Sequence, residues 1–259
     1  MHASSSNPLS IHVGATRSAM GARAASDIAS EIRALLRTQA DVHIMFAAAP
    51  SQAEMLASLI QQPDIDWSRI TALHMDEYLG LAQDAPQRFG NWLRNAIFDH
   101  LPFRHIHLIA PELAADQAVA HYTSLLAAAP LDIVCCGVGI NGHLAFNDPP
   151  ADFNDSLLVK VIALDQCSRE QQVSDGCFAS IDAVPCQAIT VTIRVLLSAR
   201  TIFCTVPGAP KNQAIRNLLE GPITESCPAT ALRMHPRCTL YLDPDSAAGI
   251  SFEGHVQPT

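Results

Sequence analysis

The 259-residue sequence lacks the features that mark several common classes of protein. Eight cysteines are present, but none forms a C-x-x-C pair and no zinc-binding motif occurs, so we expect no metal site. Positive charge is scarce, with 16 Lys and Arg against 25 Asp and Glu, and no basic run occurs. A formal net charge of -9 without a basic patch argues against a nucleic-acid partner.

Long apolar runs and targeting segments are also absent. No stretch approaches the ~18 uninterrupted apolar residues of a transmembrane helix, and the opening residues, MHASSSNPLS, contain neither a basic nor an apolar segment. We therefore expect no membrane partner and no signal peptide. Cysteines without metal-ligand spacing in such a chain are most simply reduced thiols, which predicts a cytoplasmic protein.

What is present suits a large hydrophobic core. Hydrophobic residues make up 49% of the chain and charged residues only 16%. Neither an internal repeat nor a linker-like segment divides the sequence. We therefore expect a single domain over residues 1–259, with flexible ends at about 1–9 and 246–259.

Periodicity predicts an alternation of strands and helices. Apolar residues recur every four positions at Met20, Ala24, Ile28 and Ile32, which is typical of an amphipathic helix over 17–36. Short apolar segments predict strands at 10–13, 42–47, 70–75, 105–109, 133–136, 159–163, 188–193, 202–206 and 239–242. Further helices are expected at 51–60, 87–98, 114–128, 169–173, 195–199 and 211–219. This alternation predicts an α/β fold with a mainly parallel sheet covered on both faces.

One stretch, LDIVCCGVGINGHLAFNDPP at 131–150, concentrates the chemistry. A predicted buried strand is followed by three glycines, where the backbone can turn sharply or approach a ligand. Polar residues with hydrogen-bonding side chains then gather within eight positions: Asn141, His143, Asn147 and Asp148. In open α/β sheets, ligands bind just beyond the carboxyl ends of strands. A glycine-rich turn with a solvated histidine is the competing interpretation, and the convergence of polar residues disfavours it.

Two further strand ends carry polar residues. Asp76 and Glu77 directly follow the strand predicted at 70–75. Ser51 and Glu54 have the S-x-x-E spacing of a capping box, which predicts that Ser51 opens the helix over 51–60. The start of a helix also attracts anions, so Ser51 is either a structural cap or a ligand-binding residue.

Two motifs together carry a family resemblance. HMDEYLGL at 74–81 and GVGINGHLAFNDPP at 137–150 resemble glucosamine-6-phosphate deaminases (isomerising), in the group that also holds 6-phosphogluconolactonases. The likeness runs from about 17 to 245. It implies a single Rossmann-like three-layer α/β/α domain. It also implies an enzyme that converts glucosamine 6-phosphate, or a close relative, and water to fructose 6-phosphate and ammonia without a cofactor. Lactonases typically continue the glycine loop as GHTAS-L-F, so the deaminase form is favoured.

The resemblance also implies roles for individual residues. Asp76 would be the base that moves the C2 proton, and His143 would shuttle a proton during ring opening. Asp148 and Asn141 would orient the imidazole. The family usually has Glu at position 148, so the Asp148 side chain is one methylene shorter. Three residues of the same motifs are expected to bind substrate, namely Glu77, Gly139 and Gly142.

The phosphate loop departs from the family pattern. A glycine-containing loop, P-T-G-S-T-P-like, is replaced by AAAPSQ at 47–52. Lys160 and Lys211 match family lysines and, with Ser51, are expected to bind the phosphate. Family arginines are replaced by Leu158 and Gln172, and Arg169 is a candidate substitute.

Two alternatives therefore stay open beside the deaminase. One is a related sugar isomerase or lactonase that acts on a different, even unphosphorylated, sugar. The other is a catalytically weak sugar-phosphate-binding protein. The sequence does not determine the oligomeric state, and a homo-oligomer is compatible with it.

Overall fold

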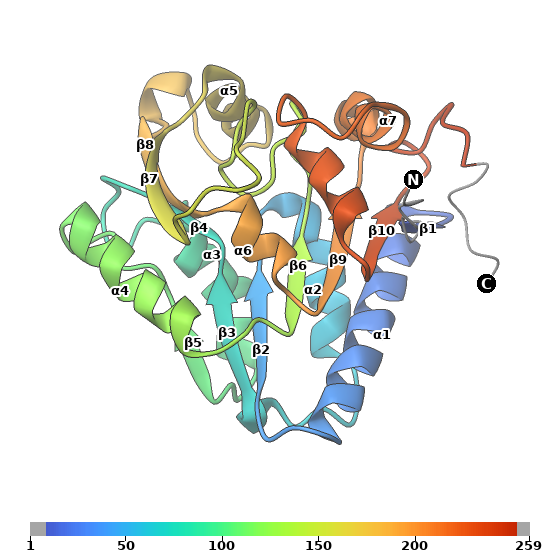
Figure 1. The fold of residues 1–259 in the computed structure, drawn as a ribbon, viewed down its shortest axis with the longest axis horizontal. Coiled ribbons are helices and arrows are strands. Elements are labelled where there is room, and N and C mark those ends of the chain that lie inside the picture. Colours follow the sequence, from blue (N-terminus) through green and yellow to red (C-terminus); the bar gives the residue numbers. More distant parts are fainter. Residues whose placement is uncertain (1–8, 253–259) are drawn as a thin grey trace, which may run out of the picture.

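A seven-stranded sheet lies between two layers of helices in the computed structural model, which describes residues 9–252 (Figure 1). The strand order is β1-β10-β9-β6-β2-β3-β5, and every neighbouring pair is parallel. The strands are β1 (Ser10–Val13), β2 (Val42–Phe46), β3 (Ile70–His74), β5 (His105–His107), β6 (Ile133–Cys136), β9 (Thr201–Val206) and β10 (Cys238–Leu242). The predicted mainly parallel α/β fold is confirmed.

Helices cover both faces of this sheet. One buried cluster joins it to α1 (Arg17–Leu36), α2 (Ala53–Ile60) and α3 (Phe89–Ala96). The other joins it to α4 (Ala115–Ala128), α6 (Ile193–Leu197) and α7 (Asn212–Glu220). Among residues 9–252, no helix combines the length and the apolar character needed to cross a membrane.

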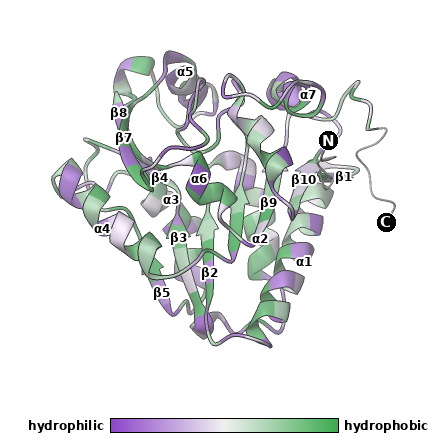
Figure 2. Ribbon diagram, in the orientation of Figure 1, coloured by the Kyte–Doolittle hydropathy of each residue, from purple (hydrophilic) through white to green (hydrophobic). Residues whose placement is uncertain are grey.

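The strands are hydrophobic because both of their faces are buried. In β2, Ile44 and Phe46 pack into the cluster with α1, and Met45 packs into the opposite cluster. Figure 2 shows the same pattern as hydrophobic colouring along the central strands. Successive side chains in a strand point to opposite faces, so a strand between two helical layers needs apolar residues at every position.

A small second sheet lies against the carboxyl edge of the first. It pairs β4 (Asp76–Tyr78), β8 (Gln187–Val191) and β7 (Val159–Ala163), with both pairings antiparallel. The strand β4 was not predicted, because Asp76 and Glu77 are polar and directly follow the apolar strand expected at 70–75. In the structure, Asp76 itself pairs with Thr190 of β8.

The predicted capping box at Ser51 is wrong. A 3₁₀ turn, Pro50–Gln52, precedes α2, and no side chain caps either helical start. Glu54 instead forms an ion pair with Arg17, 2.7 Å between Oε1 and Nε. The Ser51 side chain is therefore not engaged as a helix cap.

Of the C-terminal end predicted to be flexible, 246–259, the structure describes residues 246–252. Ala247 and Ile250 are buried at 8% exposure each and belong to the core cluster with α7. Asn212 at the start of α7 also donates to the carbonyls of Ser246 and Ala248, so this part of the segment is packed against the helix. Residues 1–8 and 253–259 of the predicted flexible ends lie outside the described residues.

Candidate active site

The candidate site is a cleft at the point where the order of strands in the sheet reverses. From β2 the chain moves outward through β3 and β5, then returns to β6 on the other side of β2 and continues to β9. Loops that follow adjacent strands separate at such a point and leave a ligand crevice. The cleft has a volume of about 500 Å³ including open solvent, and residues that follow β2, β3, β6 and β9 line it.

Asp76 presents a buried carboxylate to this cleft. It is 6% exposed, and its carboxylate oxygens have no hydrogen-bond donor among residues 9–252. Burial raises the pKa of Asp76 well above its usual range, and the neighbouring charge of Glu77 raises it further. A carboxylate with a raised pKa and no donor is a stronger base than an ordinary aspartate.

His143 lines the same cleft, and its Nδ1 is held from behind. Nδ1 lies 3.2 Å from Asp148 Oδ1 and 3.0 Å from Ser168 Oγ. The Ser168 hydroxyl donates to the same Asp148 oxygen at 2.5 Å. These acceptors favour the tautomer with the proton on Nδ1, which leaves Nε2 as an acceptor without a partner in the described chain.

Asp148 remains ionised despite its partial burial. Burial alone would raise its pKa, but the hydrogen bond and charge of His143, with donors from Ser168 and Asn141, lower it to about 2. Asn141 Nδ2 donates to Asp148 Oδ1 at 3.0 Å, and Asn141 Oδ1 accepts from the backbone N–H of His143 at 3.1 Å. The shorter side chain therefore reaches the imidazole, and Ser168 supplies a second contact between them.

Two glycines make room for this arrangement. A Cβ at Gly139 would lie 2.2–2.3 Å from atoms of the His143 ring, so the imidazole occupies the space of the missing side chain. Gly142 has a φ of +85°, and a Cβ there would lie 2.8 Å from the sulfur of Cys227. Gly139 is in the cleft lining, whereas Gly142 shapes the turn outside it.

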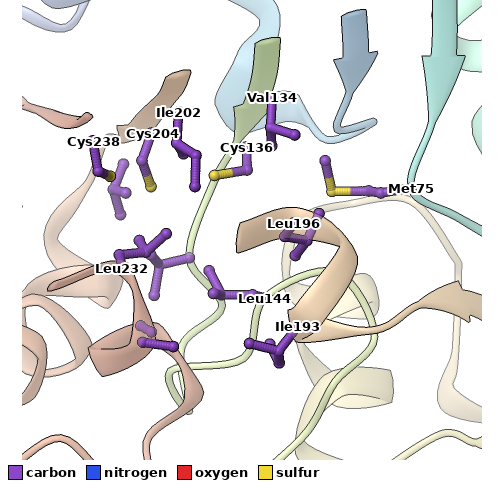
Figure 3. Close-up of a cluster of buried hydrophobic side chains, with 14 of the residues drawn as sticks. Met75, Val134, Cys136, Leu144, Ile193, Leu196, Ile202, Cys204, Leu232 and Cys238 are labelled. Atoms are coloured by element: carbon purple, nitrogen blue, oxygen red, sulfur yellow. The ribbon is translucent and has the colours of Figure 1, made fainter. Parts of the chain in front are cut away.

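The loop that carries His143 is anchored at Leu144 and at Asn147. Figure 3 shows Leu144 inserted between Leu196 and Leu232 in the apolar cluster beneath the loop. Asn147 Nδ2 donates to the carbonyls of Leu144 and Val191 at 2.9 and 2.8 Å. The loop is thereby attached to β8, the strand that also pairs with Asp76.

Lys211 supplies the positive charge in the cleft. It precedes α7 and is 8% exposed, and its ammonium group has no hydrogen bond or ion pair in the described part of the chain. Burial lowers its pKa to about 8, an effect that the charge of Asp175 partly opposes. A buried cation without a counter-ion is well placed to receive an anionic ligand.

Three other predicted residues have different surroundings. Glu77 is fully buried, and its carboxylate accepts from the backbone N–H groups of Tyr78, Phe89 and Gly90 at 2.9 Å each. Lys160 forms an ion pair with Asp155 at 2.8 Å, and Arg169 donates to backbone carbonyls. None of the three lines the cleft, because each is engaged in holding loops or a helix start.

Sequence reasoning missed several residues that line the cleft or lie behind it. Ser168 has no motif that marks it, and its contact with His143 spans 25 positions. Gln171 accepts from the backbone N–H of Ile140 at 3.0 Å and so supports the glycine loop from α5 (Gln166–Ser174). Gln52 and Gln172 also line the cleft. Nothing in the sequence marked Gln171, because a glutamine in a helical segment resembles a surface residue. Gln52 and Gln172 stand in the altered phosphate loop and at a replaced family arginine, but the sequence indicated no role for either glutamine.

Within residues 9–252, no group of three or more His, Cys, Asp or Glu side chains could hold a metal ion. The eight cysteines, all within the described range, are free thiols. What the cleft offers is a base, an oriented imidazole and a cation.

Comparison with known proteins places this geometry in a family. The sequence profile described as glucosamine-6-phosphate isomerases/6-phosphogluconolactonase matches residues 15–241. A glucosamine-6-phosphate deaminase of Streptococcus pneumoniae is 34% identical over 203 residues, which cover 77% of this chain and 84% of the relative. One from Oenococcus oeni is 32% identical over 195 residues, with 74% and 80% covered.

Solved structures agree. A monomeric glucosamine-6-phosphate deaminase superposes with a TM-score of 0.85 at 27% identity, covering 93% of this chain and 99% of that one. The 6-phosphogluconolactonase of Thermotoga maritima has a TM-score of 0.75 at 17% identity, with 91% and 99% covered, and shares the fold. The two motifs, the cleft at the sheet's switch point and these matches lead to one conclusion: the chain belongs to the glucosamine-6-phosphate isomerase/6-phosphogluconolactonase family.

Proposed function

We propose that this protein is an amino-sugar phosphate deaminase that converts glucosamine 6-phosphate, or a close relative, and water to fructose 6-phosphate and ammonia. One observation carries the proposal: the unpartnered carboxylate of Asp76 shares a cleft with the oriented imidazole of His143. Aldose–ketose conversion needs a base for a carbon-bound proton and a second group that moves protons between oxygens.

His143 acts first, on the ring form of the sugar. Its Nε2 accepts the proton of the O1 hydroxyl and returns a proton to the ring oxygen as the bond between C1 and that oxygen breaks. Asp148 stabilises the imidazolium that exists between the two transfers, because its carboxylate stays ionised beside Nδ1. The product of this step is the open-chain aldehyde.

Asp76 then acts on the open chain. Its carboxylate takes the proton from C2 while the aldehyde oxygen O1 gains a proton, which gives the enolamine. Return of the proton to C1, with loss of a proton from nitrogen, gives the imine at C2. Water adds to that imine, and ammonia leaves to give the ketose. The raised pKa of Asp76 favours both the uptake and the return of the proton, because the carboxylate and the carbon acid are then better matched.

In this proposal, the phosphate of the sugar binds at Lys211 and Ser51. Both line the cleft, at the ends of the loops that follow β9 and β2.

Ammonia release from a panel of amino-sugar phosphates, measured beside the matching free amino sugars and 6-phosphogluconolactone, tests the function. Ammonia from an amino-sugar phosphate supports it. Hydrolysis of the lactone without ammonia release contradicts it and supports the lactonase alternative.

The contacts of Asp148 and Ser168 with His143 Nδ1 lead to a graded prediction. Asp148→Ala should lower kcat by roughly ten- to a hundredfold with little change in KM, because the imidazole loses its charged partner and its fixed orientation. Ser168→Ala should lower kcat less, since the direct contact between Asp148 and His143 remains. Steady-state kinetics and thermal unfolding of both variants provide the measurement. A Ser168→Ala loss that exceeds the Asp148→Ala loss contradicts the assigned order.

Lys211→Ala should raise KM for the phosphosugar by roughly ten- to a hundredfold, since a charge-assisted hydrogen bond contributes ~1.5–3 kcal/mol. In the wild type, KM should also rise as the pH passes about 8, because Lys211 then loses its proton. The variant should lack that alkaline rise.

The chain offers a matched control, Lys160→Ala. Lys160 forms an ion pair with Asp155 outside the cleft, so its removal should leave KM unchanged. KM measured from pH 6.5 to 9 for all three proteins decides the matter. An unchanged KM in Lys211→Ala removes this lysine from substrate binding.

Partners and location follow from the same proposal. A small sugar phosphate is the partner that the cleft suits, and a homo-oligomer is compatible with it. The free thiols fit the reducing environment of the cytoplasm, which we propose as the location.

A further inference from the structure

The loop that follows β2 holds a buried glutamine in an unusual position. Gln52 is 0% exposed, and its amide forms a two-point contact with Thr205 at the end of β9. The Thr205 hydroxyl donates to Gln52 Oε1 at 2.7 Å, and Gln52 Nε2 donates to the Thr205 carbonyl at 3.2 Å. A carbonyl oxygen only accepts, so the amide nitrogen must face it and the orientation of the amide is determined.

This side chain crosses the carboxyl end of β6. In the sheet, β6 lies between β2 and β9, so the bridge from Gln52 to Thr205 passes over Gly137. A Cβ at position 137 would lie 2.8 Å from Gln52 Nε2. Position 137 must therefore be glycine, because the Gln52 amide leaves no room for a Cβ there. The Gln52 side chain thereby spans the carboxyl ends of three neighbouring strands, β2, β6 and β9.

The same amide nitrogen also contacts Ser51. Gln52 Nε2 donates to Ser51 Oγ at 3.2 Å, so the serine oxygen acts as an acceptor there. The hydroxyl proton of Ser51 has no acceptor among residues 9–252. Ser51 lines the cleft together with Lys211. The Gln52 amide therefore leaves Ser51 as a donor to whatever occupies that end of the cleft.

Part of the backbone of this loop is engaged or lacks a donor. The N–H of Ala47 donates to the Cys135 carbonyl at 2.8 Å and the N–H of Gln52 to the Ala49 carbonyl at 2.9 Å. Pro50 has no N–H at all. The N–H groups of Ala48, Ala49 and Ser51 have no acceptor among residues 9–252, and all three residues line the cleft. For an anion bound there, the Ser51 hydroxyl adds a side-chain donor to these backbone donors.

We propose that Gln52, locked by Thr205, is a positioning residue that directs the Ser51 hydroxyl at the phosphate of the substrate, beside Lys211. The inference rests on the proposed function for the identity of the substrate. It assigns to this loop a side-chain contact with the anion, beside the backbone N–H groups that remain without acceptors. Gln52 itself has no amide proton left for the ligand, so its effect passes through Ser51.

A double-mutant cycle tests the relay. Ser51→Ala should raise KM for glucosamine 6-phosphate about tenfold, which is the loss of one hydrogen bond to a charged group. Gln52→Met, of similar volume, should raise it by a similar factor with kcat nearly unchanged. Adding Ser51→Ala to Gln52→Met should then change KM less than twofold, because the hydroxyl is already misdirected. KM for the unphosphorylated amino sugar should not respond.

Thr205→Val provides a second route if Gln52→Met does not fold. It removes the donor to Oε1 while it keeps the volume, and Thr201→Val, at the opposite end of β9, is the matched control. The Thr201 hydroxyl contacts Glu31, far from the cleft, so that variant should retain the wild-type KM. Thermal unfolding of every variant separates lost positioning from lost stability.

Binding of inorganic phosphate, measured by titration calorimetry, keeps this inference separable from the proposed function. Ser51→Ala and Thr205→Val should each weaken phosphate binding several-fold, and the double variant should be no weaker. If amino sugars are not turned over yet phosphate binding shows this coupling, the function is wrong and the relay stands. If turnover occurs and the two variants act additively on KM, the relay is wrong and the function stands.

Discussion

Asp76→Asn should lower kcat by ~10²–10⁴-fold, the range expected when general base catalysis is lost. The amide occupies the same space but cannot accept the C2 proton. In the wild type, the acidic limb of the pH–rate profile should lie above the pH at which an ordinary aspartate ionises, because burial raises the pKa of Asp76. Steady-state kinetics over pH 4–9 measures both effects. A variant with wild-type kcat would remove Asp76 from the mechanism.

The same substitution should not weaken the fold. The pKa of Asp76 is higher in the folded than in the unfolded chain, so its contribution to stability is greatest below the unfolded pKa. That contribution falls as the pH rises towards the folded pKa. Asparagine carries no charge, so Asp76→Asn should unfold at a higher Tm than the wild type wherever Asp76 is ionised. A lower Tm at neutral pH contradicts the assigned burial penalty.

Gly139→Ala should cost roughly a hundredfold in kcat, because displacement of a catalytic group by about 1 Å can have that effect. The new methyl group would lie 2.2–2.3 Å from the imidazole of His143, so the ring must leave its contact with Asp148. Neither the charge nor the hydrogen-bonding groups of the cleft change. Kinetics would therefore report displacement of His143 alone.

Gly80→Ala is the control for general glycine effects. Gly80 has a φ of +89°, and a Cβ there would meet no atom within 4 Å. Alanine at that φ costs ~1 kcal/mol of stability through backbone strain. The Gly80→Ala variant should lower Tm and leave kcat unchanged. In Gly139→Ala, by contrast, the loss of kcat should be the main effect. Equal losses of kcat in both variants would attribute the effect to global destabilisation.

The local pattern of the sequence determined most of the helices and strands. Apolar residues every four positions placed α1 at Arg17–Leu36, and Thr16 caps it through a hydrogen bond to the N–H of Ala19. The run at Ile133–Cys136 predicted a buried strand, and β6 lies at the centre of the sheet. These features depend on neighbours within one helical turn or one strand, so periodicity is enough to find them.

The motifs also located the polar strand ends. Asp76, Gly139 and His143 are three of the predicted residues that line one cleft. Sequence order alone suggested this, because the ends of parallel strands meet at one edge of a sheet. The likeness to glucosamine-6-phosphate deaminases, first visible in two short motifs, extends over most of the chain.

Only the tertiary structure decided which side chains meet. It paired Asp76 with β8, joined Ser168 to His143 and Gln52 to Thr205, and turned Lys160 to Asp155 instead of the cleft. The pairing with β8 and the contacts of Ser168 and Gln52 join residues 25 or more positions apart. Lys160 and Asp155 lie only five apart, but their contact depends on how β7 is placed against β8. Local periodicity carries no record of such contacts, because they depend on the packing of whole elements and on which polar groups burial forces to find a partner.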